Sequence, residues 1–209
     1  MTGGSRPGVD RAREDIEFAA SIRTRASEVT LRFHSTWGLF SPREVDLGTV
    51  LLLEEVEVAP EADCFDLGCG YGPIGLTLAR LAPAGETLMV DRDYVAVEYA
   101  NRNATANGIA NARAILSNGF SEVPEGQMFD LVATNLPAKV GNEMTSILFA
   151  DAHDRLRPAG QLLVVTLSGM RKYIQRTIEE TFGNYEKVRQ GRQHTVHRAV
   201  RLPGDSVRD

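Results

Sequence analysis

The chain has 209 residues, of which 43% are apolar and 24% are charged, and its formal net charge is −5. This length fits one domain with short appendages, and the composition excludes collagen-like, low-complexity and largely disordered proteins. The acidic balance excludes a general nucleic-acid coat, and the polar N-terminus and short aliphatic runs exclude a secretory signal and a membrane span. We therefore expect a cytoplasmic protein without a membrane partner.

The N-terminal part is predicted to be an extension that covers residues 1–40. Residues 1–9 form a polar lead, and Asp10 can cap a helix over 10–27 whose face carries Ala12, Ile16, Ala19, Ala20 and Arg23. Residues 28–40 alternate apolar and polar side chains, which predicts a strand. The main domain is then predicted over 41–202, with a tail at 203–209.

From residue 41 the chain alternates short apolar strands with helices. Strands are predicted at 63–67, 87–90, 112–116, 129–134 and 161–167, and helices at 46–56, 73–81, 93–106, 142–156 and 170–182. Residues 157–160 are predicted to turn, and two alternating runs follow at 185–188 and 194–200. This order predicts a Rossmann-like α/β fold, with a doubly wound, mostly parallel seven-stranded sheet that ends in an antiparallel hairpin.

A glycine-rich segment, Asp66-Leu-Gly68-Cys-Gly70-Tyr-Gly72, lies between a predicted strand and a predicted helix. Glycines there allow positive φ and a close approach of the backbone to a ligand at the carboxyl end of the strand. The spacing Gly70-x-Gly72-x-x-Gly75 also satisfies the dinucleotide fingerprint, so the glycines alone do not distinguish a nicotinamide oxidoreductase from a methyltransferase.

Acidic residues favour the methyltransferase. Asp66 would suit the ammonium of a methionine moiety and would repel a pyrophosphate, and Asp91 ends the next strand, where it can accept hydrogen bonds from ribose hydroxyls. The chain also lacks the Tyr-x-x-x-Lys pair of a reductase.

These motifs resemble those of class I S-adenosylmethionine-dependent methyltransferases of the small methyltransferase domain family. The chain is most similar to the 16S ribosomal RNA guanine-N2 methyltransferases and their compact archaeal relatives. The resemblance covers about 39–202 and rests on residues 38–41, 45–49, 51–53, 66–72, 91, 117–119, and Asn135-x-Pro137. It implies an S-adenosyl-L-methionine cofactor and, as partner, ribosomal RNA or the small ribosomal subunit.

The resemblance also implies which residues bind the cofactor. The glycine loop would face the methionine part and the sugar, Asp91 the ribose and Arg92 the adenine face, while Thr49 would flank the methionine carboxylate. The complete predicted set is Thr49, Asp66, Gly68, Cys69, Gly70, Gly72, Asp91, Arg92, Asn118 and Gly119.

The segment after the fourth predicted strand, Asn135-Leu136-Pro137, is the predicted catalytic motif. The Asn135 side-chain oxygen and the Leu136 carbonyl could accept both hydrogens of an exocyclic amine and direct its lone pair toward a methyl group. The family motif is Asn-Pro-Pro followed by an aromatic residue, whereas this chain has Leu136 and Ala138. Trp37 and Phe40 could supply the missing stacking surface, so the predicted substrate-binding residues are Trp37, Phe40 and Ala138.

No metal site is predicted. Cys64 and Cys69 lack metal-ligand spacing, His194 and His197 would point to opposite faces of a strand, and His34 and His153 have no partners in the pattern. Residues 171–201 carry eight Lys or Arg and three Glu, a net charge of +5, which could meet phosphates or form a solvated surface.

The sequence thus predicts an N-methyltransferase that acts on an exocyclic amine of guanine in ribosomal RNA. Two alternatives stay open: a methyltransferase for a small molecule or protein side chain, and a non-catalytic ribosome-associated protein of the same fold. A nicotinamide oxidoreductase is a more distant alternative. The sequence does not predict the oligomeric state.

Overall fold

The computed structural model describes residues 14–204. Its main sheet has the strand order β5-β4-β3-β6-β7-β9-β8. The first five in this order, β5 (Ala112–Leu116), β4 (Thr87–Asp91), β3 (Cys64–Leu67), β6 (Phe129–Asn135) and β7 (Leu156–Leu167), pair in parallel. The strands β9 (His194–Val200) and β8 (Glu186–Gln190) pair antiparallel at one edge. The predicted fold class, including the C-terminal hairpin, is confirmed.

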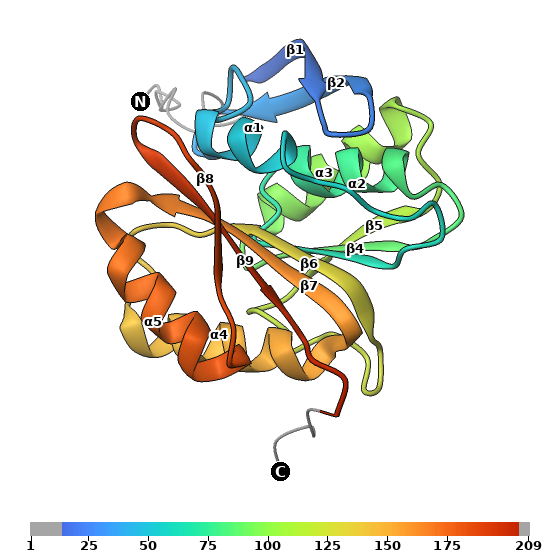
Figure 1. Cartoon of the computed structure of the whole chain (residues 1–209). Helices are drawn as coiled ribbons and strands as arrows, with labels where there is room; N and C mark the ends of the chain where they lie inside the picture. Colours follow the sequence, from blue (N-terminus) through green and yellow to red (C-terminus); the bar gives the residue numbers. More distant parts are fainter. Residues whose placement is uncertain (1–13, 205–209) are drawn as a thin grey trace, which may run out of the picture.

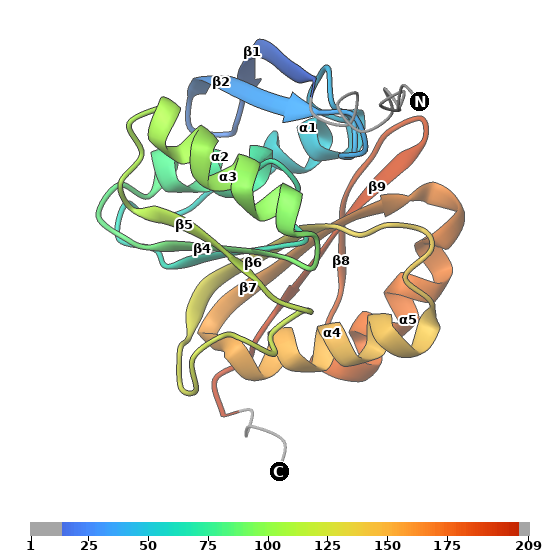
Figure 2. The same cartoon turned by 180° about the vertical axis from the view of Figure 1, so that it is seen from behind.

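Helices cover both faces of this sheet (Figures 1 and 2). One face carries α1 (Leu47–Leu53), α2 (Pro73–Leu81) and α3 (Tyr94–Ala106), and the other carries α4 (Asn142–Arg155) and α5 (Arg171–Phe182). Neighbouring strand residues alternate between the two apolar cores, so that Cys64 faces the first and Phe65 the second. A parallel sheet buried on both faces explains why these strands read as short apolar runs.

Two helices of the main domain, α1 and α3, begin after aspartates whose side chains cap free N–H groups. Asp46 caps α1 by accepting hydrogen bonds from the backbone of Gly48 and Thr49, and Asp93 caps α3 through Val95. Pro73 occupies the first turn of α2, where no N–H is needed. These local signals explain why the predicted helices agree closely with the observed ones.

The predicted helix over residues 10–27 is wrong where the structure describes it. Asp15–Arg23 form a strand, β1, that pairs antiparallel with β2 (Glu28–Thr36). The more buried side chains of β1 recur at every second residue, namely Ile16, Phe18, Ala20 and Ile22, so that period two prevails over the helical spacing of the alanines. The predicted cap Asp10 and Ala12 lie outside the described residues.

The β1–β2 hairpin packs on the side of the sheet that carries α2 and α3 (Figure 2). The rings of Phe18, Phe33 and Tyr71 pack together with centroids 5.4–5.9 Å apart. Asn103 of α3 binds both backbone groups of His34 and also donates to the Tyr71 carbonyl. The hairpin therefore shares the core of the main domain. The domain boundaries at 40/41 and 202/203 stay predictions.

Residues 157–160, predicted as a turn, are instead part of β7. The strand pairing between β6 and β7 shifts register near Phe129, and Ala159 adopts a positive φ of 67°. Backbone hydrogen bonds join Ala159 and Gly160 to Arg201, so the irregular segment stays in the sheet as a bulge. Among residues 14–204, no helix combines the length and apolar character needed to cross a membrane.

Candidate active site

A cavity of about 590 Å³ opens at the carboxyl ends of β3, β4 and β6. Ligands bind at this edge in open α/β sheets, and the volume lies in the range of small-molecule sites, about 300–1,000 Å³. The predicted site residues that line it are Phe40, Thr49, Gly68, Cys69, Gly70, Asp91, Arg92, Asn118, Gly119, Asn135, Leu136 and Pro137. Four predicted residues, Asp66, Gly72, Trp37 and Ala138, do not line it.

The glycine loop forms the floor of the cavity with backbone rather than side chains. Gly68 and Gly70 have positive φ values of 77° and 55°, and a Cβ at either position would meet no atom within 4 Å. Gly72, with a φ of 98°, instead turns the chain into α2 and lies against Leu76. The loop thus leaves open space beside Gly68 and Gly70, whereas Gly72 forms the turn into α2.

Asp91, at the end of β4, is held in place by the loop. Its Oδ2 accepts the Gly70 N–H at 2.9 Å, and its Oδ1 accepts the Asp93 N–H at 3.0 Å. A carboxylate oxygen can accept two hydrogen bonds, so both oxygens retain acceptor capacity on the cavity side. This fixed carboxylate suits a ligand with paired hydroxyl donors.

Asp66 has a different environment from the one that its position in the motif predicted. The side chain is fully buried below the loop, where Oδ2 accepts the Gly75 N–H of α2 at 2.7 Å. Burial, with a smaller contribution from the Asp91 carboxylate, raises the pKa of Asp66 to about 7, although the Gly75 hydrogen bond lowers it. The Asp66 carboxyl group, on β3, therefore lies against the first turn of α2 and is not part of the cavity lining.

Asn135, the last residue of β6, is oriented by the start of α1. Its Nδ2 donates to Asp46 Oδ2 at 2.9 Å and to Thr49 Oγ1 at 3.0 Å. Because a carboxylate only accepts hydrogen bonds, the amide nitrogen must face Asp46, and Oδ1 faces away from it. In the sequence, Asp46 belongs to a motif at the start of a predicted helix, and nothing in that pattern indicates that its side chain reaches Asn135.

Leu136 fills the position that proline holds in the family motif. Its N–H donates to the Val165 carbonyl at 3.0 Å, which extends the pairing of β6 with β7, and its side chain is buried. Within residues 14–204, no backbone N–H donates to the Leu136 carbonyl. Leu136 therefore retains a carbonyl acceptor next to the Asn135 side chain.

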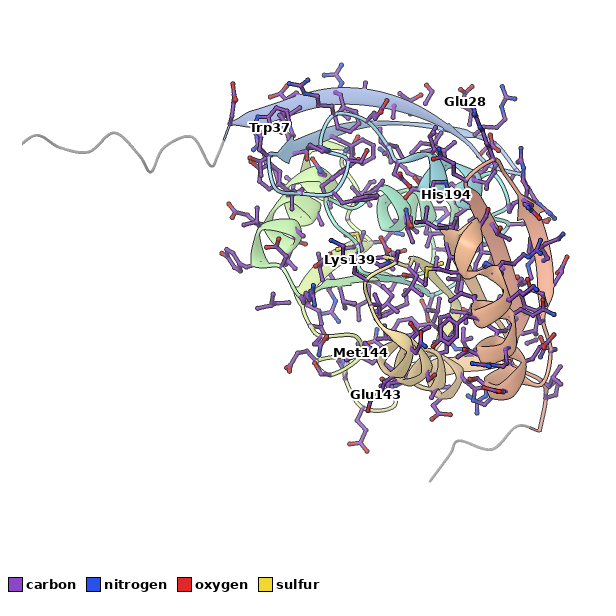
Figure 3. The ribbon with its side chains drawn as sticks, turned by 90° about the vertical axis from the view of Figure 1, so that its left-hand side faces the viewer. Glu28, Trp37, Lys139, Glu143, Met144 and His194 are labelled. Carbon is purple, nitrogen blue, oxygen red and sulfur yellow. The ribbon has the colours of Figure 1, made fainter. Side chains whose placement is uncertain are left out.

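The rim of the cavity is partly apolar. Phe40 lines the opening and is 68% exposed, whereas Trp37 is 45% exposed and has the Arg43 guanidinium 4.5 Å from its ring centroid. Figure 3 looks onto this edge of the sheet and labels Trp37, Lys139 and Met144. Four further lining residues, which the motif analysis missed, come from the segment after β6 and from α4: Lys139, Val140, Met144 and Leu148.

Cys64, Cys69 and His197 are buried, whereas His194 is half-buried. Burial raises the pKa of the Cys64 thiol to about 12 and that of Cys69 well above its usual value. His197 lies between the hydroxyls of Thr166 and Tyr185, at 3.0 and 3.1 Å, and burial lowers its pKa to about 4. His194 lies on the other side of β9 against Gly48, so the two histidines point apart as predicted.

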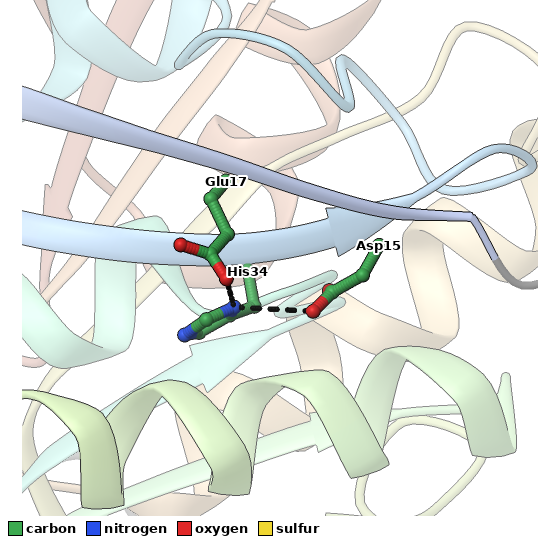
Figure 4. Close-up of side chains that lie close together, drawn as sticks. All are labelled: Asp15, Glu17 and His34. Carbon is green, nitrogen blue, oxygen red and sulfur yellow. Dashed lines mark ion pairs between the residues drawn. The ribbon is translucent and has the colours of Figure 1, made fainter.

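The prediction that His34 and His153 stand without partners is wrong. His34 Nδ1 lies 3.5 Å from Asp15 Oδ2 and 3.3 Å from Glu17 Oε1 across the hairpin (Figure 4). His153 Nδ1 lies 3.1 Å from Asp154 Oδ1. Strand pairing brings His34 and the two acids together, and a helix was predicted where those acids lie.

Part of the C-terminal positive charge is neutralised by nearby acids. Arg189 pairs with Glu54 and Glu55 of the α1 end, and Arg198 pairs with Glu186 on the neighbouring strand. Arg201 is buried and donates to the Leu156 carbonyl. The segment thus contributes less free positive charge than its composition indicates.

The doubly wound sheet with an antiparallel β9, the open glycine loop and the polar end of β6 together define a class I methyltransferase. The comparisons with known proteins agree with this class. Residues 30–198 match the methyltransferase small domain family, and the chain belongs to that family.

The chain is also similar in sequence to named proteins. The chain is 34% identical to YbxB of Bacillus subtilis over 186 residues, which is 87% of this chain and 90% of YbxB. It is 31% identical to ribosomal RNA small subunit methyltransferase C of Pseudomonas syringae over 168 residues, 78% of this chain and 49% of the relative. The chain therefore spans about half the length of that ribosomal RNA methyltransferase.

A solved structure shows the same arrangement. The 16S rRNA N2 G1207 methyltransferase of T. thermophilus, in complex with AdoMet and guanosine, matches with a TM-score of 0.76 and 29% identity. The match covers 89% of this chain and 51% of that chain.

Proposed function

We propose that the protein is an S-adenosylmethionine-dependent N-methyltransferase that acts on an exocyclic amine of guanine in ribosomal RNA. The observation that carries this proposal is the orientation of Asn135, whose amide nitrogen is bound by Asp46 and Thr49 so that the oxygen is left to accept a hydrogen bond. An amine substrate needs such an acceptor, because it presents only N–H groups at the reacting nitrogen. With this substrate, we also propose that the activity is cytoplasmic.

The cavity has the donors, acceptors and space that the cofactor requires. The open backbone at Gly68 and Gly70 leaves room for the methionine part, and the fixed Asp91 carboxylate offers acceptors for two ribose hydroxyls. We assign Arg92, Asn118 and Gly119, which follow β4 and β5, to the adenine. Cys69 adds backbone to the same floor of the cavity.

Thr49 and Asp66 have roles that follow from their contacts. Thr49 accepts a hydrogen bond from Asn135 with its hydroxyl oxygen, so its own hydrogen remains free to donate to the methionine carboxylate. Asp66 lies below the loop, and we propose that it stabilises the start of α2 and does not contact the cofactor. Gly72 likewise shapes the turn into α2.

S-adenosylmethionine supplies an electrophilic methyl group when bound. The protein then has to position a weak nucleophile, because the lone pair of an exocyclic amine is delocalised into its ring. The Asn135 Oδ1 and the Leu136 carbonyl accept the two amine hydrogens and so hold the nitrogen with its lone pair out of the ring plane. The same two acceptors stabilise the positive charge that develops on the nitrogen as the N–C bond forms and the S–C bond breaks, so no ionised base is needed beforehand. The surplus proton of the methylated amine leaves to solvent afterwards.

Two observations support guanine in rRNA as the substrate: the names of the relatives and an aromatic residue at the cavity opening. Both the Pseudomonas and the T. thermophilus relatives are named as small-subunit rRNA methyltransferases, and the latter's structure holds guanosine. The exposed Phe40 ring at the opening offers a base the stacking surface that Ala138 lacks. Pro137 lines the same opening, whereas Trp37 lies outside the lining, next to the lining residue Gly38.

A second candidate substrate is a small molecule or a protein side chain. The ion pairs of Arg189 and Arg198 favour it, because they leave less free positive charge to bind a phosphate backbone.

Transfer of a labelled methyl group tests the proposal. The pools are the RNA of small ribosomal subunits from cells lacking the protein, RNA of large subunits, total protein and small metabolites. We expect label in small-subunit RNA, its loss with Asn135→Ala, and retention with Asn142→Ala, an exposed asparagine outside the cavity lining. Label confined to protein or metabolites supports the second candidate, and transfer that survives Asn135→Ala contradicts the amine-binding mechanism.

A further inference from the structure

We propose that Asp46 and Thr49 are positioning residues that hold the Asn135 carboxamide in the one orientation that presents its oxygen to an amine. This inference rests on the proposed function and adds residues that the catalytic motif does not contain. The residues act through Asn135 and need not contact the reacting atoms.

The contacts are specific to one orientation of the amide. Asn135 Nδ2 donates two hydrogen bonds, to a carboxylate at 2.9 Å and to a hydroxyl at 3.0 Å, and an amide nitrogen has two hydrogens to donate. If the amide were flipped, Oδ1 would lie at hydrogen-bond distance from an acceptor-only carboxylate. Its nitrogen would then point its hydrogens at the N–H groups of the incoming amine. The flipped form is therefore disfavoured by Asp46 and unproductive for an amine.

Asp46 is itself held by the start of α1. The same Oδ2 accepts the N–H groups of Gly48 and Thr49 at 2.8 and 3.2 Å, so three donors converge on one oxygen. The side chain cannot rotate away from Asn135 without also uncapping the helix. The orientation of an amide at the end of β6 is thus coupled to the first turn of a helix that lies far away in the sequence.

Gly48 makes room for this arrangement. A Cβ at position 48 would lie 2.9 Å from Asp46 Oδ2 and 2.9 Å from the His194 ring. The absence of a side chain there leaves room for the Asp46 carboxylate and for the ring of His194, the first residue of β9. A glycine at position 48 is therefore needed where the α1 cap and the start of β9 come close together.

Substitutions at Asp46 can separate its capping of α1 from its positioning of the Asn135 side chain. Asp46→Ser retains a strong N-cap, but its hydroxyl is one bond shorter and does not reach Asn135. Asp46→Asn retains a carbonyl oxygen that can accept all three hydrogen bonds. We expect Asp46→Ser to lower kcat by about 10- to 100-fold, below the 10²–10³-fold typical of losing a transition-state contact outright. Asp46→Asn should lose clearly less than Asp46→Ser, and S-adenosylhomocysteine should bind each variant within about threefold of the wild type.

A double-mutant cycle then tests whether Asp46 acts through Asn135. In the Asn135→Ala background, Asp46→Ser should lower the remaining rate no further, because the group that it positions is gone. An equal loss in both backgrounds would overturn the inference. Thr49→Val and Thr49→Ser form a second pair, in which we expect Thr49→Ser to lose less kcat than Thr49→Val, because only Ser retains the acceptor.

The Asn135 side-chain amide gives a readout that needs no substrate. In ¹⁵N-labelled full-length protein we expect its two hydrogens to exchange slowly, and we expect Asp46→Ser to speed that exchange at least tenfold while the thermal melting curve stays cooperative. Unchanged exchange overturns the inference even if methyl transfer is confirmed. Slow exchange with no transfer into any pool instead contradicts the proposed function, and with it the catalytic role of the two residues.

Discussion

The Gly70 N–H donates to Asp91 Oδ2 at 2.9 Å and thereby joins the glycine loop after β3 to the end of β4. The bond holds the backbone and the carboxylate on adjoining sides of one cavity. It also uses only part of the acceptor capacity of Asp91, so the group that shapes the loop remains available to a ligand.

Asp91→Ala should therefore weaken cofactor binding strongly. Two hydroxyl hydrogen bonds to a charged acceptor are lost, each contributing about 1.5–3 kcal/mol, which predicts a loss of affinity for S-adenosylhomocysteine of roughly 10²-fold or more. Isothermal titration calorimetry measures this loss. Asp93→Ala removes a neighbouring carboxylate that does not accept the Gly70 N–H, and its smaller effect serves as the comparison. Equal affinities of the wild type and Asp91→Ala would exclude Asp91 from the site.

The turn at Gly72 should be sensitive to a single methyl group. Gly72→Ala imposes a φ near 98° on alanine and places Cβ 3.2 Å from Leu76, so we expect a loss of about 2–3 kcal/mol in the free energy of unfolding. Gly108→Ala is the matched control, since its φ is 62° and its Cβ would meet nothing within 4 Å. There the loss should be about 1 kcal/mol. Urea denaturation compares the two, and equal losses would show that contact with Leu76 contributes nothing.

Lys139 is an exposed cation in the cavity lining, and it should contribute to RNA binding. Lys139→Ala should raise KM for an RNA substrate several-fold, leave kcat nearly unchanged, and reduce the slope of log affinity against log salt by about 1. Arg176→Ala, on α5 and outside the cavity lining, should leave both quantities close to those of the wild type. A salt slope that Lys139→Ala leaves unchanged would exclude a phosphate contact at this residue.

The stability of the fold should depend on the neutral form of His197. Burial lowers its pKa from 6.5 to about 4, so the unfolded chain takes up a proton first as the pH falls. The contribution of His197 is complete above pH 6.5 and is lost progressively toward pH 4, by at most about 3 kcal/mol. The buried Asp66 acts in the opposite direction, because its raised pKa makes stability fall as the pH rises from about 4 to 7.

His197→Gln isolates the histidine contribution. Between pH 6.5 and 4.5 the wild type should lose about 2 kcal/mol more than this variant, as measured by urea denaturation at each pH. Parallel pH profiles would show that His197 takes up a proton as readily in the folded protein as in the unfolded chain.

The parts of the fold that could be predicted are those specified by residues close together in the sequence. The helix over 73–81 was predicted with its observed ends, because Gly72-Pro73 at the start specifies the turn and first residue. The strand β1 was missed because Ala19 and Ala20 suggested a helix, while the alternation of Ile16 with Phe18 becomes decisive only when β2 pairs with it.

The candidate site was predictable where its residues lie at the ends of strands that neighbour one another in the sheet. Gly68, Asp91 and Asn135 meet because parallel strands bring their carboxyl ends to one edge. The burial of Asp66 and the bond between Asp46 and Asn135 could not be predicted, because each depends on how a side chain packs in three dimensions. Asp46 and Asn135 are 89 positions apart, and no periodicity connects them.

A crystal structure of the protein with S-adenosylhomocysteine tests the central claim most directly. We expect the ligand in the cavity at the ends of β3, β4 and β6, with its ribose hydroxyls on Asp91 and its sulfur facing the Asn135 side of the cavity. A ligand found elsewhere, or one in the cavity with its ribose away from Asp91, would contradict the account.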